Sequence, residues 1–305
     1  MFVPQAHFAP ELAPLELLPL LIPALLYWWR ALHLAQRGRP VPRWRQLCFA
    51  SGLAAIALSL IGLGEPADEL LWPHMVEHLL IGDLAAILLV LGLTGPLLQP
   101  ILAIKPLDRL RALAHPAVAL PLWAIDLYVW HVPVLYQATL SNDPVHALEH
   151  GMFIFFGCVM WMPVLGPLPK PAWFTAGWKV VYVIGVRFVS ALLGNIFLWS
   201  GSVIYPAYEA SDAAHHLSPL ADQGVAGAIM MAEGMFVTLG VLAWAFLKWA
   251  SETTERQRLL DLAEARGVHL DEARAARAVA AGQAKHLEER LLADEPEIPG
   301  AASPG

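Results

Sequence analysis

Long runs of apolar residues, separated by short polar or turn-forming segments, dominate this chain. A helix that crosses the hydrocarbon core of a bilayer needs about 20 mostly apolar residues, and each run has about that length. The intervening segments are rich in Gly, Pro, Asn and Asp, which favour turns. The pattern predicts an all-α, polytopic transmembrane bundle of seven helices. The seven runs cover approximately residues 14–34, 45–63, 73–99, 117–140, 144–165, 177–200 and 224–249.

The pattern changes after residue 250. Residues 251–294 are rich in Ala, Glu, Arg and Leu at helical spacing, which predicts a cytoplasmic amphipathic helical tail. Residues 295–305 contain Pro, Gly and acidic residues and are predicted to be disordered. The expected organisation is therefore a transmembrane domain over 1–250, followed by the tail and the disordered end.

Basic residues alternate between the loops. Lys and Arg occur after the first, third and fifth runs and in the tail, whereas residues 1–13, 64–72, 141–143 and 201–223 contain neither. Because cytoplasmic loops of membrane proteins are enriched in Lys and Arg, we expect the N-terminus outside and the C-terminus in the cytoplasm. The expected location is a cytoplasmic membrane.

Composition narrows the classes of function. The chain is 57% hydrophobic and 15% charged, whereas soluble domains carry about 25% charged residues. The net charge is -7, and residues 251–305 hold 11 acidic and 7 basic residues, so no basic patch indicates a nucleic-acid partner. The two cysteines, Cys48 and Cys158, lie in apolar runs and form no CxxC motif, which argues against a disulfide framework or a thiol-based metal carrier.

The motif His-x-x-Glu-His occurs twice, at residues 74–78 and 146–150. A proline precedes each copy, as is common at the first position of a helix. Histidines four residues apart lie on one helix face with Cβ atoms about 6 Å apart, a spacing that lets one helix offer two imidazoles to one metal ion. Both copies fall at outer helix ends in the predicted topology.

His131 is a third element of the predicted site. It lies in the fourth run, roughly 15 Å below the outer end of that helix. Pro133 should kink the helix there and free a backbone carbonyl. Ionisable groups inside membrane segments are costly and mark functional sites. We therefore predict that five histidines line one outward-facing cavity and bind a metal ion: His74, His78, His131, His146 and His150.

Copper fits these residues better than zinc, because methionines accompany the histidines while thiols do not. We expect Cu(I), with haem as the alternative cofactor, since two histidines on different helices can ligate haem iron. Residues that could add ligands or orient the imidazoles are Met75, Glu77, Glu149, Met152, Asp222, Met230 and Met231.

Other ionisable residues also lie within the apolar runs. An isolated charge there would be expensive, so Asp126 in the fourth run is expected to pair with Arg187 in the sixth as a structural contact. Asp83 and Glu233 are expected either to be protonated and hydrogen-bonded or to extend the polar cavity.

Three blocks of the chain resemble the CtaG family of cytochrome c oxidase assembly proteins, in its Bacillus-type, seven-helix group. They are HMVEHLL with the later GPLL, WHVPVLYQATLSNDPVHALEHGMFIFFGCVMWMPVLG, and SPLADQGVAGAIMM, and they occur in the family's order over roughly residues 15–250. The segment after His78 lacks the methionines that the family often carries, and Asp83 stands in the polar place.

The resemblance implies an assembly factor rather than an enzyme, which handles copper for a terminal oxidase. Its partners would be oxidase subunits, a periplasmic copper donor protein and the lipid bilayer. The residues carried over by motif include Asp222 and Gln223 together with the five histidines and Glu149. Three alternatives remain: a copper permease, a haem protein for electron transfer, and a scaffold without a metal.

Overall fold

The computed structural model describes residues 17–171, 173–280 and 282–293, and all regular structure in them is helical. Six helices are long and apolar enough to cross a membrane, or seven if a bent pair of segments over 108–130 forms one span. The protein is therefore a multi-pass membrane protein by length and composition. The chain divides into two compact units, residues 1–238 and 239–305.

The helices of the first unit follow the predicted runs closely. The predicted start of the first helix, at residue 14, lies outside the described residues. The helices are α2 (Leu18–Gln36), α3 (Arg43–Glu69), α4 (Leu71–Leu79), η1 (Leu80–Ala85), α5 (Ala86–Gly92), α6 (Gly95–Leu102), η2 (Lys105–Ala114), α7 (Pro116–Trp130), α8 (Pro133–Thr139), α9 (Asp143–Leu165), α10 (Ala176–Trp199), η3 (Pro206–Tyr208), α11 (Glu209–Ala214) and the first part of α12 (Pro219–Ala265).

Two predicted helices are broken. The third run is not one helix over 73–99: α4 passes into the π-helical turn η1, α5 ends at Gly92, and α6 is separate. The fourth run breaks between Trp130 and Pro133, where the proline was expected to kink it. A π-helical turn adds a residue to the turn and often accompanies functional sites. Here η1 directly follows the segment that carries His74 and His78.

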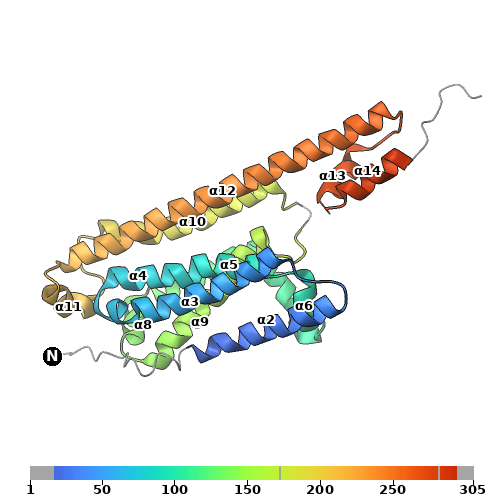
Figure 1. The fold of residues 1–305 in the computed structure, drawn as a ribbon. Coiled ribbons are helices and arrows are strands. Elements are labelled where there is room, and N and C mark those ends of the chain that lie inside the picture. Colours follow the sequence, from blue (N-terminus) through green and yellow to red (C-terminus); the bar gives the residue numbers. More distant parts are fainter. Residues whose placement is uncertain (1–16, 172, 281, 294–305) are drawn as a thin grey trace, which may run out of the picture. The chain divides into compact units, whose positions relative to one another are not determined.

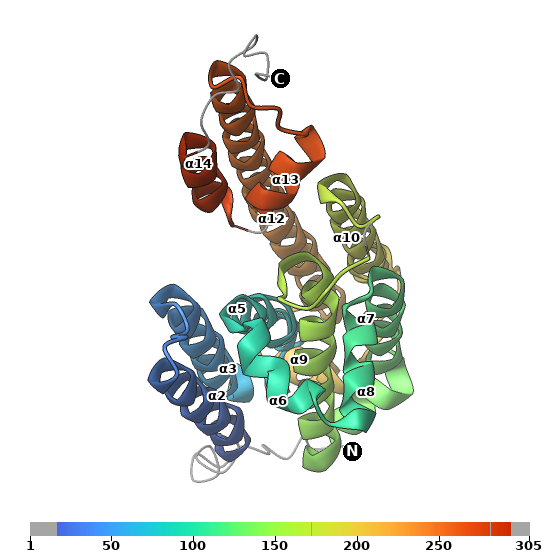
Figure 2. The same cartoon turned by 90° about the vertical axis from the view of Figure 1, so that its right-hand side faces the viewer.

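The helices of the first unit pack in a row. Figure 2 shows α3 beside α5, α5 beside α9, and α9 beside α7, with α2 and α10 at the two sides. Segments α4, η1 and α5 lie one after another along α3 (Figure 1). The two helices that carry the His-x-x-Glu-His motifs, α4 and α9, are therefore held in the middle of the row.

A close backbone contact brings α9 against the third span. A Cβ atom added at Gly157 would lie 2.0 Å from the carbonyl oxygen of Gly82 and 3.0 Å from Cβ of Ala86. Only glycine fits at such a contact. It lies below both motifs, since Gly82 follows His78 by one turn and Gly157 follows His150 by two.

The second unit contains the end of α12, α13 (Glu272–Ala280) and α14 (Ala284–Ala293). The helix α12 continues to Ala265 rather than ending near residue 249, because residues 250–265 are strong helix formers without Pro or Gly. Turns with positive φ at Gly267 and Gly282 then fold the tail back. The predicted disordered end, 295–305, lies outside the described residues.

Candidate metal centre

Both His-x-x-Glu-His motifs begin within the first turns of a helix, as the sequence predicts. In α9, Asn142 caps the helix: its side-chain oxygen accepts a hydrogen bond from the Val145 N–H at 3.2 Å. In α4, the carboxylate of Asp222 accepts hydrogen bonds from the N–H groups of Leu71 at 2.7 Å and Trp72 at 3.0 Å. Each pair of histidines thus sits on a helix end that is held by a side-chain cap.

The four motif histidines form one compact group. Within each helix, the ring centroids are 4.2 Å apart, for His74 with His78 and for His146 with His150. Between the helices, His74 stacks on His146 at 5.6 Å, and His78 meets His150 edge-on at 5.4 Å. The two motifs therefore face each other between α4 and α9.

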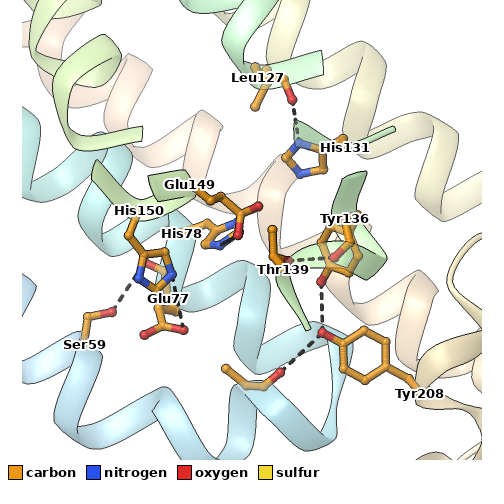
Figure 3. A network of polar contacts seen from close by, with 11 residues as sticks. Ser59, Glu77, His78, Leu127, His131, Tyr136, Thr139, Glu149, His150 and Tyr208 are labelled. Atoms are coloured by element: carbon orange, nitrogen blue, oxygen red, sulfur yellow. Dashed lines mark hydrogen bonds and ion pairs between the residues drawn. The ribbon is translucent and has the colours of Figure 1, made fainter. Parts of the chain in front are cut away.

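The glutamates of the motifs cross between the helices. The Nε2 atom of His78 lies 3.7 Å from Oε2 of Glu149, and Nε2 of His150 lies 4.0 Å from Oε2 of Glu77. Figure 3 shows these contacts from α4 to α9 and back. The carboxylate of each glutamate thus lies beside the second histidine of the other motif.

Two sets of these side chains have ligand atoms within 4.8 Å of one another: His74, His78, His146 and Glu149 form the first, and Glu77, His146 and His150 the second. All of these side chains are buried. Buried polar atoms normally have hydrogen-bond partners. Both ring nitrogens of His78 and Nε2 of His150 have none among the described residues. A cation bound between the helices would satisfy them, so the donor set fits a metal ion.

His131 stands at the edge of this group. Its ring centroid is 6.5 Å from that of His78, and it belongs to neither set of ligand atoms among the described residues. Its Nδ1 atom lies 2.7 Å from the carbonyl oxygen of Leu127, and its own carbonyl accepts a hydrogen bond from the Tyr205 hydroxyl at 2.8 Å. At the helix break before Pro133, the carbonyls of Leu127 and His131 are therefore bonded to the side chains of His131 and Tyr205. The Nε2 atom of His131 lies on the side of the ring away from Leu127 (Figure 3). It has no hydrogen-bond partner among the described residues.

The methionines fall into two groups. Met75 and Met230 are buried and line a cavity of about 50 Å³ with His78 and His131. Met152 instead packs against the apolar core around α2, α3 and α9. The sulfur of Met231 lies 3.5 Å from the amide nitrogen of Asn195 on α10. Met160 lines the same cavity, so three thioether groups of the described residues, those of Met75, Met160 and Met230, adjoin His78 and His131.

The side chains of Asp222 and Gln223, at the start of α12, bind the backbone of neighbouring segments. Both carboxylate oxygens of Asp222 accept backbone hydrogen bonds at the start of α4, and Asp222 is in neither set of ligand atoms among the described residues. The side chain of Gln223 accepts a hydrogen bond from the Ile204 N–H at 2.8 Å and donates to the carbonyls of Phe197 and Ser202.

Burial and the neighbouring carboxylate of Asp222 raise the pKa of Asp212 to about 6.

Arg187 forms a different ion pair from the one predicted with Asp126. Its guanidinium donates to Asp83 at 2.8 Å and lies 3.6 Å from the carboxylate of Glu233. Trp161 donates a hydrogen bond to the other oxygen of Asp83 at 2.6 Å. The π-helical turn η1 rotates Asp83 toward α10, where the arginine reaches it, and this rotation could not be read from helical periodicity. Asp83 and Glu233 thus belong to a buried charge network.

Three tyrosines at this end of the bundle were missed from the sequence. The rings of Tyr136 and Tyr205 stack at 3.9 Å, and the hydroxyls of Tyr136 and Tyr208 are 3.0 Å apart. Tyr208 also donates to the carbonyl of Ala67, close to the start of α4. Their only signal in the sequence is that all three fall in or beside the loops next to the predicted outer surface.

Comparison with known families agrees with the resemblance seen in the sequence. Residues 25–252 match a family described as cytochrome c oxidase caa3 assembly factor (Caa3_CtaG). No curated protein and no solved structure matches the chain. The matched range contains every residue of the histidine and glutamate cluster.

Proposed function

The chain belongs to the cytochrome c oxidase caa3 assembly factor family, and we propose that it binds copper at the cluster of four histidines and two glutamates and passes it to an apo-oxidase subunit. The observation that carries this proposal is the facing pair of motifs, whose buried ligand atoms converge from α4 and α9. Packing alone does not explain why both ring nitrogens of His78 and Nε2 of His150 are buried without a hydrogen-bond partner among the described residues.

Copper is proposed as the cargo because of the ligand types. Imidazole binds Cu, Zn, Fe and Ni, whereas thioether selects Cu(I), and Met75 and Met230 line the cavity that His78 and His131 also line. Neither Cys48 nor Cys158 joins the ligand sets of the described residues. A site without thiolates holds copper less tightly than a thiolate site would, which suits an ion that must be released.

The two ligand sets suggest how the ion is transferred. His146 belongs to both sets, so a copper ion can pass from one set to the other while one ligand stays bound. Glu149 and Glu77 lie next to the histidines of the opposite helix and would balance the positive charge of the ion. Exchange of one ligand at a time would let the ion leave without being released into solution.

The outer face of the membrane is the proposed side of delivery. The histidines lie near the start of α4, whereas Arg45 donates hydrogen bonds to the carbonyls of Leu91 and Leu93 at the opposite end of that span. Basic residues are enriched on the cytoplasmic side of membrane proteins, which supports a cluster that faces outward. We propose that the copper donor is a periplasmic protein and that the protein resides in a bacterial inner membrane.

This proposal is preferred to a permease or a haem protein. A permease needs a polar path to the other membrane face, but below the cluster α9 meets the third span at the close backbone contact of Gly157 with Gly82. Five histidines at one level also exceed the two that haem requires.

The test measures Cu and Zn in the purified protein, its visible spectrum, and oxidase activity in cells. We compare the parent with the double variant His78→Ala/His150→Ala and with His33→Ala, which removes a histidine of α2 far along the chain from both motifs. Copper in the parent and in His33→Ala, but not in the double variant, together with loss of oxidase activity in the double variant only, is the expected result. A Soret band, or normal oxidase activity in the double variant, would overturn the proposal.

A further inference from the structure

Three arginines in the second unit lie without an ion-pair partner among the described residues. Arg274, Arg277 and Arg290 line one cavity of about 320 Å³ between α13 and α14, together with Gln283 and His286. The other arginines described in this unit have partners: Arg256 pairs with Glu272, Arg258 with Glu288, and Arg266 donates to the carbonyl of Leu292. The three unpaired arginines are therefore a local exception.

The three arginines concentrate positive charge around the cavity between α13 and α14. Arg274 and Arg277 are three residues apart on α13, so they lie on one face. His286 and Arg290 are four apart on α14 and face the same cavity. Among the described residues no acidic side chain lines it, although Glu289 lies 3.9 Å from His286. Three guanidinium groups converging on one cavity have the chemistry of a phosphate site, because the planar fork of arginine matches phosphate oxygens.

The hairpin that forms the cavity is built to hold its shape. Leu259 and Ala263 of α12 pack against Leu287 and Leu291 of α14, and these four residues form a buried apolar core. Arg266 donates a hydrogen bond to the carbonyl of Leu292, which fixes the end of α14. The arginines of the cavity therefore stand on helices that are already in place.

The cavity also lies close to the membrane-exposed part of α12. Leu247 and Trp249 of α12 are exposed apolar residues, as expected at the end of a membrane span. Val279 and Ala280, at the end of α13, line a second depression together with Trp249. Arg277 lies three residues before Ala280 on α13, so the headgroup of an anionic phospholipid is one of the phosphate sources to be tested.

We propose that the α13–α14 hairpin binds a phosphate-bearing anion in the cavity of Arg274, Arg277 and Arg290. Two sources share this chemistry: the headgroup of an anionic phospholipid and a soluble phosphate compound. All lining residues lie beyond the residues matched by the family, so this site does not depend on the proposed copper function.

The experiment uses the full chain in detergent and has two arms. Native mass spectrometry follows binding of phosphatidylglycerol against phosphatidylcholine with the same acyl chains, and calorimetry follows binding of inorganic pyrophosphate. The variants are Arg274→Gln/Arg277→Gln/Arg290→Gln and the same triple change to Lys. The matched control is Lys285→Gln, which removes a positive charge of the same hairpin that does not line the cavity.

We expect the triple Gln variant to weaken binding in at least one arm by about tenfold or more, and the triple Lys variant to retain part of it, because charge remains but the bidentate fork is lost. Lys285→Gln should change affinity by less than about twofold. Preference for phosphatidylglycerol with weak pyrophosphate binding identifies a lipid site, and the reverse identifies a soluble ligand. Equal binding by the parent and the triple Gln variant in both arms, or an equal loss in Lys285→Gln, would overturn the proposal. Hydrogen exchange of residues 284–293 verifies that the hairpin stays folded.

Discussion

The imidazole of His78 on α4 faces the carboxylate of Glu149 on α9, with Nε2 and Oε2 3.7 Å apart, although the two residues are separated by a long stretch of chain. His150 and Glu77 repeat the relationship in the opposite direction at 4.0 Å. Each copy of the motif therefore provides two histidines on its own helix and a glutamate that lies beside a histidine of the other copy. The two crossed pairs require both copies of the motif. With one copy alone, the second histidine of that copy would have no glutamate from the other helix beside it.

The crossed glutamates should contribute to metal affinity. Glu149→Gln keeps the size of the side chain but removes the charge that faces His78, so copper should bind about tenfold or more weakly. Glu77→Gln should act in the same direction through His150. The measurement is competition for Cu(I) with a chromogenic chelator. Glu65→Gln, an exposed residue of α3, is the control and should leave affinity unchanged; a similar loss in this control would contradict the assigned role.

Asp222 should act on the site through α4. Asp222→Ala removes two hydrogen bonds from the N–H groups of Leu71 and Trp72, which should cost about 1–2 kcal/mol and allow the start of α4 to fray. Because His74 and His78 lie in that segment, copper affinity should fall as well. Hydrogen exchange at Leu71 and Trp72 reports the fraying directly. Asp222→Asn, which retains an acceptor, should show a smaller effect; unchanged protection in Asp222→Ala would contradict the assignment.

Gly157 should tolerate no side chain. In Gly157→Ala the new Cβ would lie 2.0 Å from the carbonyl oxygen of Gly82, so α9 must move away from η1, at a cost of about 1–3 kcal/mol or more. The apparent melting temperature of the protein in detergent should fall, and copper binding should weaken because the two motifs separate. Gly62→Ala on α3 is the matched control, since no atom lies within 4 Å of its Cβ. Alanine there should be neutral or stabilising by up to about 1 kcal/mol.

Arg187 should be required for a folded bundle. Arg187→Leu would leave the carboxylates of Asp83 and Glu233 without a cation, and removal of one partner of a buried ion pair costs about 3–5 kcal/mol. The yield of monodisperse protein in detergent should drop sharply. The triple variant Arg187→Leu/Asp83→Asn/Glu233→Gln should recover much of that yield, because no buried charge is left. A triple variant as poor as the single one would show that the network is not the cause.

The segment of α11 that carries Asp212 should be less stable at neutral pH than at acidic pH. The pKa of Asp212, about 6, lies above the ordinary value near 3.9 for an unfolded chain, so the folded state holds the proton more tightly. This contribution to stability is present below about pH 4 and is lost as the pH rises through about 6. The melting temperature should therefore be higher at pH 5 than at pH 8. In Asp212→Asn this difference should shrink and the protein should gain stability at pH 8; an unchanged pH profile would contradict the assignment.

Much of the architecture was predictable from one-dimensional patterns. Runs of apolar residues located the helices because a bilayer sets their length, and Pro133 located the break between α7 and α8 because proline cannot continue the hydrogen-bond ladder. The i,i+4 spacing of His74 with His78 and of His146 with His150 placed each pair on one face of its helix. These features depend only on neighbours along the chain, so the sequence contains them directly.

The contacts between helices were decided by the tertiary structure. Helical periodicity states which residues share a face, but not toward which neighbour that face is turned. The π-helical turn η1 adds a residue, and one extra residue rotates all that follows by about 100°. Asp83 lies within this turn and contacts Arg187 and Trp161, so the pair expected between Arg187 and Asp126 is not the one observed. The sequence by itself thus determined the helices, the two imidazole pairs and the kink. The crossing of Glu77 and Glu149, the capping role of Asp222 and the partner of Arg187 arise only when the helices pack, because they join residues whose relative rotation and distance no local pattern determines.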